Sequence, residues 1–196
     1  MLDNQRGSLV VTALIILMML TLIGIAVTTT ASLELQISGN EKLSKVAFYR
    51  ADGGTEVGFE LLEQNLGCAS GFTSPTITGD NSTMSVQVNT STFWQNQTAP
   101  VPSPAAVPNP DFYYPASLAA YAPNTTNVTV GGNTALSTGS AIQMASGYEG
   151  KGKGAGAGGA YILYDMYSRH DGTNNTRSII IVQWRHVIGQ EGSCNY

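Results

Sequence analysis

The chain has 196 residues and a formal net charge of −4, with nine Lys and Arg against thirteen Asp and Glu. No Lys or Arg occurs between Arg50 and Lys151, so the sequence lacks the clustered cations that bind a nucleic-acid backbone, and we expect no nucleic-acid partner. A length of this kind suits one domain with an appended segment.

The appended segment is the stretch from Ser8 to Val27, which is almost entirely apolar. As an α-helix with a rise of ~1.5 Å per residue it would extend about 30 Å, the thickness of the hydrocarbon core of a bilayer. A secretory signal normally has a shorter apolar core, roughly 7 to 15 residues, followed by a small-residue cleavage site. Only a weak site of that kind follows Ala26, so we favour a retained transmembrane helix over a signal peptide.

The helical pattern continues beyond the apolar stretch, and no proline precedes Pro75. Apolar or small residues recur mostly at steps of three or four, which is typical of an amphipathic helix. These positions, all apolar or small except Arg50, are Leu33, Ile37, Leu43, Ala47, Arg50, Gly54, Val57 and Leu61. The sequence therefore predicts one long helix over residues 8–66, transmembrane over 8–27 and amphipathic beyond. The glycines at 39, 53, 54 and 58 indicate either close packing against a neighbouring element or places where the helix loosens.

Residues 67–196 differ in composition, being rich in Ser, Thr, Asn, Gly and Pro. Most of the eight prolines fall at about 98–116, which predicts a surface loop or extended insertion rather than a helix interior or a central strand. Short alternating runs at 83–88 and 127–132 predict modest strands. Longer runs at 160–169 and 177–189 predict an antiparallel hairpin around the turn-rich residues 170–176.

The expected fold class is therefore α+β. A long N-terminal α-helix, transmembrane and then amphipathic, packs on a small antiparallel β-sheet domain. The apolar side of the predicted C-terminal hairpin is expected to face the amphipathic half of the helix.

A glycine-rich stretch at 147–159 contains the spacings G-x-x-x-x-G-K and G-x-G-x-x-G. Both are phosphate-binding patterns only when a helix follows, because the helix N-terminus holds the phosphate. A predicted strand follows here, so we interpret the stretch as a loop.

The remaining polar residues do not form a recognisable site. His170, in the predicted turn, and His186, in a strand, have no cluster of metal ligands around them in the sequence. Four possible calcium ligands near the turn lack EF-hand spacing: Asp165, Asp171, Asn174 and Asn175. We therefore expect no catalytic residue, no cofactor and no metal, and a protein that is not an enzyme.

Cys68 and Cys194 are the two cysteines of the chain. In an exported domain such a sparse pair indicates one disulfide, and the alternative is two unrelated buried thiols. A bridge between them would close a very long loop and would stabilise the fold by roughly 4 to 5 kcal/mol. We expect the disulfide.

At the N-terminus a short polar leader ends in Arg6-Gly7, and the apolar helix follows at once. This arrangement resembles the class III signal of type IV pilins and pseudopilins. In that family a membrane peptidase cuts after the glycine and methylates the new N-terminus. The resemblance implies a prepilin leader over residues 1–7, cleavage between Gly7 and Ser8, and N-methylation of Ser8.

A second motif joins a small-Gly-Asn triplet to an Ala-Phe-x-x-Ala-acidic-x-Gly pattern. Its residues are Gly39, Asn40, Ala47, Phe48, Ala51, Asp52 and Gly54. This motif resembles that of minor pilins of the PilX type, and the C-terminal region 147–189 is similar to them more loosely.

Thr12 departs from the pattern of the major pilins. They carry a glutamate at the fifth mature position, where it is thought to meet the N-terminal amine of a neighbouring subunit, and that position is Thr12 here. An acid in an apolar span costs ~2.5 to 3.5 kcal/mol and persists only with a partner. PilX-type and tip-located subunits often lack this acid, so its absence points to a minor or tip position.

The resemblance implies a minor pilin that helps to initiate and assemble the type IV pilus in a priming or tip complex. The implied partners are other minor pilins and the major pilin, contacted through the N-terminal helix, the prepilin peptidase and a tip adhesin. Before assembly the protein would span the bacterial inner membrane once, with residues 67–196 outside the cytoplasm, and later it would lie in the pilus at the cell surface. Two alternatives remain: a type II secretion minor pseudopilin, and a single-pass membrane-anchored surface binding domain that enters no filament.

Overall fold

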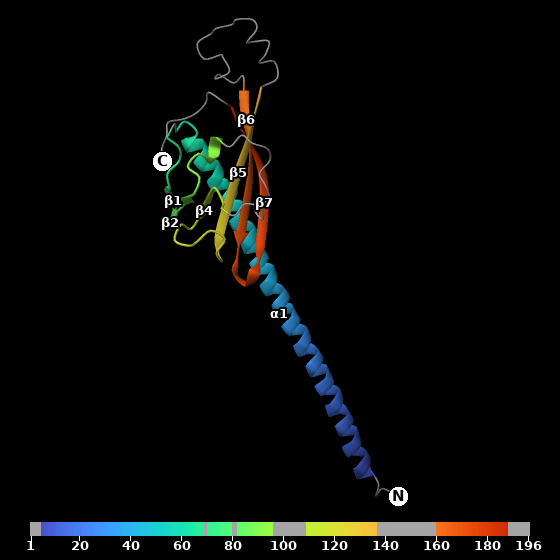
Figure 1. The fold of residues 1–196 in the computed structure, drawn as a ribbon. Coiled ribbons are helices and arrows are strands. Elements are labelled where there is room, and N and C mark those ends of the chain that lie inside the picture. Colours follow the sequence, from blue (N-terminus) through green and yellow to red (C-terminus); the bar gives the residue numbers. More distant parts are fainter. Residues whose placement is uncertain (1–4, 69, 80–81, 96–108, 137–159, 188–196) are drawn as a thin grey trace, which may run out of the picture. The chain divides into compact units, whose positions relative to one another are not determined.

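The structure, a computed structural model, describes residues 5–68, 70–79, 82–95, 109–136 and 160–187 (Figure 1). Contacts divide the chain into two units, Met1–Lys42 and Leu43–Tyr196. One helix, α1, extends from Gln5 to Asn65, and the rest of the described chain is mainly β structure. The predicted α+β class, with a long N-terminal helix and a small antiparallel sheet domain, is confirmed.

The main sheet has five antiparallel strands in the order β3-β4-β5-β6-β7. Their bounds are Gln87–Val88 for β3, Phe112–Tyr114 for β4, Thr125–Leu136 for β5, Ala160–Asp171 for β6 and Arg177–Val187 for β7. Strands β1 (Thr76–Gly79) and β2 (Ser82–Ser85) form a separate antiparallel pair. Two 3-10 helices, η1 (Phe93–Gln95) and η3 (Thr173–Asn175), complete the described elements.

The C-terminal hairpin of β6 and β7 is confirmed. Its register pairs Tyr164 with Trp184 and Asp171 with Arg177, and alternate residues of β6 are fully buried, as a strand with one face on a core requires. The predicted turn is too long, however, because His170 and Asp171 belong to β6. The His170 side chain is only 1% exposed. Because it is buried, the strand continues to this end instead of turning at residue 170.

Strand β4 corrects the interpretation of the proline-rich region. Residues 112–114 lie within the insertion predicted at about 98–116, yet they form a strand between β3 and β5. Phe112 is completely buried, and Pro110 and Pro115 flank the strand without removing a donor inside it. Residues 98–108 of that insertion lie outside the described part.

A buried aspartate fixes the beginning of β4. Asp111 donates its backbone N–H to Val128 O at 3.0 Å, and its Oδ2 accepts the N–H of Val130 at 2.8 Å. Burial raises the pKa of Asp111, and the hydrogen bond from Val130 partly offsets that rise. This side chain therefore ties β4 to β5 where a proline-rich segment enters the sheet.

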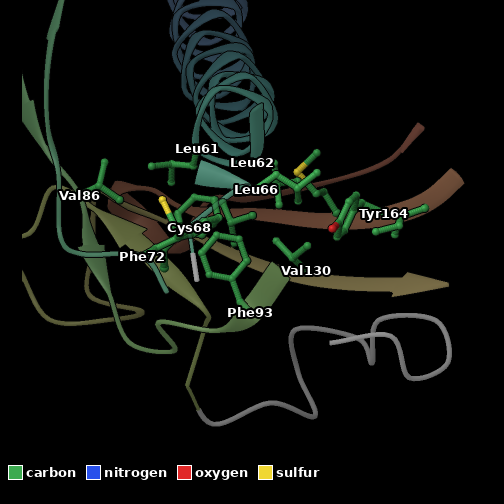
Figure 2. Packing of buried hydrophobic residues seen from close by; sticks show 13 residues of the cluster. Leu61, Leu62, Leu66, Cys68, Phe72, Val86, Phe93, Val130 and Tyr164 are labelled. Atoms are coloured by element: carbon green, nitrogen blue, oxygen red, sulfur yellow. The ribbon is translucent and has the colours of Figure 1, made fainter. Parts of the chain in front are cut away.

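The core of the second unit lies between the C-terminal part of α1 and the sheet. Figure 2 shows Leu61 and Leu62 of α1, and Leu66 just after it, in one buried cluster with Phe93, Val130 and Tyr164. On the helix, Ala47 and Ala51 are buried but Arg50 is exposed. From Ala47 to Leu61 the expected face is confirmed except at Arg50, because the buried stripe passes through Ala51 instead. For Leu33 and Ile37 the expectation is wrong, since both side chains are exposed.

Candidate functional site

The apolar part of α1 has no protein around it in the first unit. Every residue from Gly7 to Lys42 is exposed, including the large apolar side chains, with Leu9 at 72%. By length and composition this helix could cross a membrane. A helix that is apolar on all sides is stable only where lipid or other apolar helices cover it, so this segment is built for insertion.

The hydroxyl groups in this segment are satisfied by the helix itself. Thr12 Oγ1 donates to Ser8 O at 2.8 Å, and Thr21 Oγ1 donates to Met18 O at 2.8 Å. Thr28, Thr29 and Thr30 likewise donate to carbonyls three or four residues earlier. A hydroxyl bonded in this way needs no partner in hydrocarbon, whereas a carboxylate at position 12 would need one.

The predicted cleavage residues, Gly7 and Ser8, lie in the first turns of α1. A side chain at Gly7 would meet nothing within 4 Å, and both residues are exposed. No further feature of the described chain bears on cleavage, which stays a prediction.

The seven motif residues fall on two sides of α1. Ala47, Ala51 and Gly54 are buried against the sheet. The other four are exposed: Gly39, Asn40, Phe48 and Asp52. Phe48 is 51% exposed and meets Tyr49 edge-on, with ring centroids 5.7 Å apart. The three buried motif residues thus attach the helix to its own domain, and the other four face outward.

Small residues let the sheet approach the helix backbone. A Cβ on Gly54 would overlap Ser168 Oγ and lie 2.7 Å from Thr126 Cγ2, and a Cβ on Gly58 would press on Met166 Sδ. Gly39 faces open space, and a Cβ on Gly53 would meet only Tyr114 Oη at 3.6 Å. Of the two interpretations of these glycines, close packing is therefore right for Gly54 and Gly58, whereas Gly39 packs against no other part of the described chain.

Hydrogen bonds reinforce this contact. Ser168 Oγ donates to Ala51 O at 2.5 Å, and Tyr114 Oη donates to Arg50 O at 3.1 Å. Thr126 Oγ1 lies 3.4 Å from the same Arg50 oxygen. These side chains come from β6, β4 and β5, so three strands of the sheet hold one turn of the helix.

His170 lies beside this turn, deeper than the sequence suggested. Its Nδ1 is 2.9 Å from Thr126 Oγ1, while its Nε2 is buried and has no hydrogen-bond partner among the described residues. Burial lowers the pKa of His170, and the positive charge of Arg50 lowers it further. The nearby phenol of Tyr114 has a raised pKa because of its burial. No sequence signal places His170 against the helix, because Arg50 and Thr126 are far from it in the chain.

The two aspartates considered for calcium bind other side chains. Asp171 Oδ1 accepts from Arg169 Nη2 at 2.8 Å and from Arg177 Nε at 2.9 Å, and Asp165 Oδ1 accepts from Gln183 Nε2 at 2.9 Å. In the described ranges no three His, Cys, Asp or Glu side chains gather as metal ligands. The glycine-rich stretch 147–159 lies outside those ranges.

Cys68, at the end of the helix, is disulfide-bonded. Its side chain is buried among Leu66, Phe72 and the other residues of the core. Cys194 lies outside the described residues, so the pairing of Cys68 with Cys194 stays a prediction.

Comparison with known proteins finds one family whose matched region lies within the long helix. Residues 6–56 match the model of a family described as PilX N-terminal. The matched region contains the apolar segment, Thr12 and all seven motif residues, and it lies within α1. No curated protein and no solved structure matches the chain.

Proposed function

From the premise that the chain is a PilX-type minor pilin of the type IV pilus, we propose that it acts in the complex that primes the filament or forms its tip. Pilins are structural subunits, and the mechanism is packing rather than catalysis. The apolar segment 8–27 anchors the subunit in the inner membrane and then inserts among the equivalent helices of other pilins.

The observation that carries this proposal is Thr12. Its hydroxyl is satisfied by Ser8 O within the same helix, and no acidic residue occurs from Gly7 to Leu33. The subunit thus brings no carboxylate to a neighbour's N-terminal amine. Such a subunit fits an end of the filament more easily than the repeating shaft. At an end it has neighbouring subunits on one side only, so fewer N-terminal amines need a carboxylate.

An exposed aromatic residue of the motif and its neighbour support contacts with other subunits. Phe48 and Tyr49 present two aromatic rings on α1 outside the core of the domain. Aromatic residues contribute strongly at protein interfaces. We expect them to face neighbouring minor pilins or the major pilin.

Before assembly the domain lies outside the cytoplasm. The disulfide bond of Cys68 supports this location, because such bonds persist in oxidising compartments. Cleavage after Gly7 by the prepilin peptidase and methylation of Ser8 belong to the same proposal, as does a tip adhesin as partner of the domain.

Two measurements test the proposed position. Purified pili would be labelled with gold-conjugated antibody against residues 67–196, and the amount of this protein relative to the major pilin would be quantified by mass spectrometry. A tip complex gives label at one end and an amount that does not increase with fibre length. Label along the shaft would refute the tip position, and normal piliation without this protein in the fibres would favour the anchored surface domain.

A further inference from the structure

A hollow of about 480 Å³ opens beside the turn of α1 that the sheet holds. Arg50 of α1, Met84 of β2 and His170 of β6 line it, together with the segment that follows β4. This volume lies within the range of about 300 to 1,000 Å³ that is usual for small-ligand sites.

Arg50 supplies the one permanent charge among the described residues that line the hollow. Its Nη1 donates to Asn124 Oδ1 over a long 3.4 Å, and in the described part of the chain it has no acidic partner within salt-bridge distance. A guanidinium group has five N–H donors. Most of the donors of Arg50 are therefore open to a ligand.

The other walls combine a fixed amide with apolar surface. Asn124 has a left-handed backbone, with φ of 67°, and its N–H donates to Asp171 O at 2.6 Å. Its side chain is thereby held beside Arg50. Met84, Pro115 and Leu118 form an apolar wall.

We propose that this hollow binds a carboxylate group that is attached to an apolar group. The carboxylate pairs with the guanidinium fork of Arg50, a geometry that favours two parallel hydrogen bonds. The apolar group packs on Leu118 and its neighbours. A phosphate would bring about two negative charges to a single cation, so a monoanion with an apolar body matches the walls better.

His170 offers a reporter of this event. It lines the hollow, and the charge of Arg50 already lowers its pKa, second to burial. A bound carboxylate neutralises that charge, so the imidazole of His170 becomes easier to protonate and its NMR signals shift.

Two sources share this chemistry, a free organic acid and the C-terminal carboxylate of a peptide. The full chain in detergent micelles, labelled at histidine, would be titrated with 4-methylpentanoate, with acetyl-Gly-Gly-Leu, and with the same peptide as its C-terminal amide. We expect the acids to shift the His170 signals and the amide to bind at least about tenfold more weakly, because charge-assisted hydrogen bonds are roughly twice as strong as neutral ones. Binding of 4-methylpentanoate assigns a small acid as a sufficient ligand, and binding of the peptide acid alone assigns a chain terminus.

Matched variants locate the site. Arg50→Gln should weaken binding of the acids by at least about tenfold, while Lys45→Gln removes a cation from an exposed position of the same helix and should leave the affinity unchanged. Three results would overturn the proposal: equal binding of acid and amide, equal effects of the two substitutions, or no binding of the acids at about 10 mM, a concentration ten times a dissociation constant of about 1 mM. The acid-amide comparison uses the unmodified protein and stands even where a variant folds poorly.

Discussion

The adjacent glycines Gly53 and Gly54 should differ in their response to the same substitution, because Gly54→Ala alone should destabilise the fold. Gly54→Ala places a methyl group on Ser168 Oγ and 2.7 Å from Thr126 Cγ2, whereas Gly53→Ala meets only Tyr114 Oη at 3.6 Å. Both replacements gain helix propensity, about 1 kcal/mol in a helix interior. Only the first must push the sheet away from the helix.

The size of the effect at Gly54 follows from the steric overlap and from the hydrogen bond that it breaks. Overpacking a close contact costs about 1 to 3 kcal/mol, and displacement of Ser168 removes its hydrogen bond to Ala51 O, worth about 1 kcal/mol. After the gain in propensity, Gly54→Ala should lower the free energy of unfolding by about 1 to 3 kcal/mol. Gly53→Ala should leave it unchanged or raise it by up to about 1 kcal/mol.

Urea unfolding of the full chain in mild detergent, followed by tryptophan fluorescence, measures this difference. Trp184 of β7 lies 6.0 Å from Phe59 of α1 between ring centroids, so its emission reports on the contact between helix and sheet. Because Ser168→Ala removes the overlapping hydroxyl, the double variant Gly54→Ala/Ser168→Ala should lose less than the sum of the single effects. Equal stability of the two glycine variants would refute the description of this contact.

Two further predictions concern stability. In the folded state burial and then the charge of Arg50 lower the pKa of His170 from 6.5, and Asp171 opposes this shift. Neutral His170 therefore contributes its full share of the unfolding free energy above pH 6.5, and this share is lost as the pH falls below that value. His170→Asn should therefore reduce the loss of unfolding free energy between pH 7 and pH 5, and an unchanged pH dependence would contradict this assignment. If Cys68 pairs with Cys194, then Cys68→Ser, Cys194→Ser and the double variant should each lower the free energy of unfolding by the same amount, roughly 2 to 5 kcal/mol. Additive losses in the same urea assay, or two alkylatable thiols in the native protein, would exclude the bridge.

Elements with strong periodicity could be predicted from the sequence. The apolar run and the three- and four-residue steps give α1, since no proline interrupts them. The alternation in 160–169 and 177–189 gives the hairpin of β6 and β7. Local patterns suffice in these segments because each one repeats its pattern over many residues.

Other features depend on contacts between distant residues. Strand β4 is only three residues long and is flanked by prolines, so its local composition predicts a loop, and burial of Phe112 in the core decides otherwise. Likewise, the motif names Gly54, but its partner Ser168 lies on β6. The hollow at Arg50 has no local signal, because its walls come from separate parts of the chain.

The most direct test of the account is the mass of the mature protein isolated from cell membranes or pili. A PilX-type minor pilin processed by the prepilin peptidase should begin at Ser8 and carry one N-terminal methyl group. An intact chain that still begins at Met1 in cells with active peptidase, or one cut behind the apolar segment after Ala26, would contradict the account.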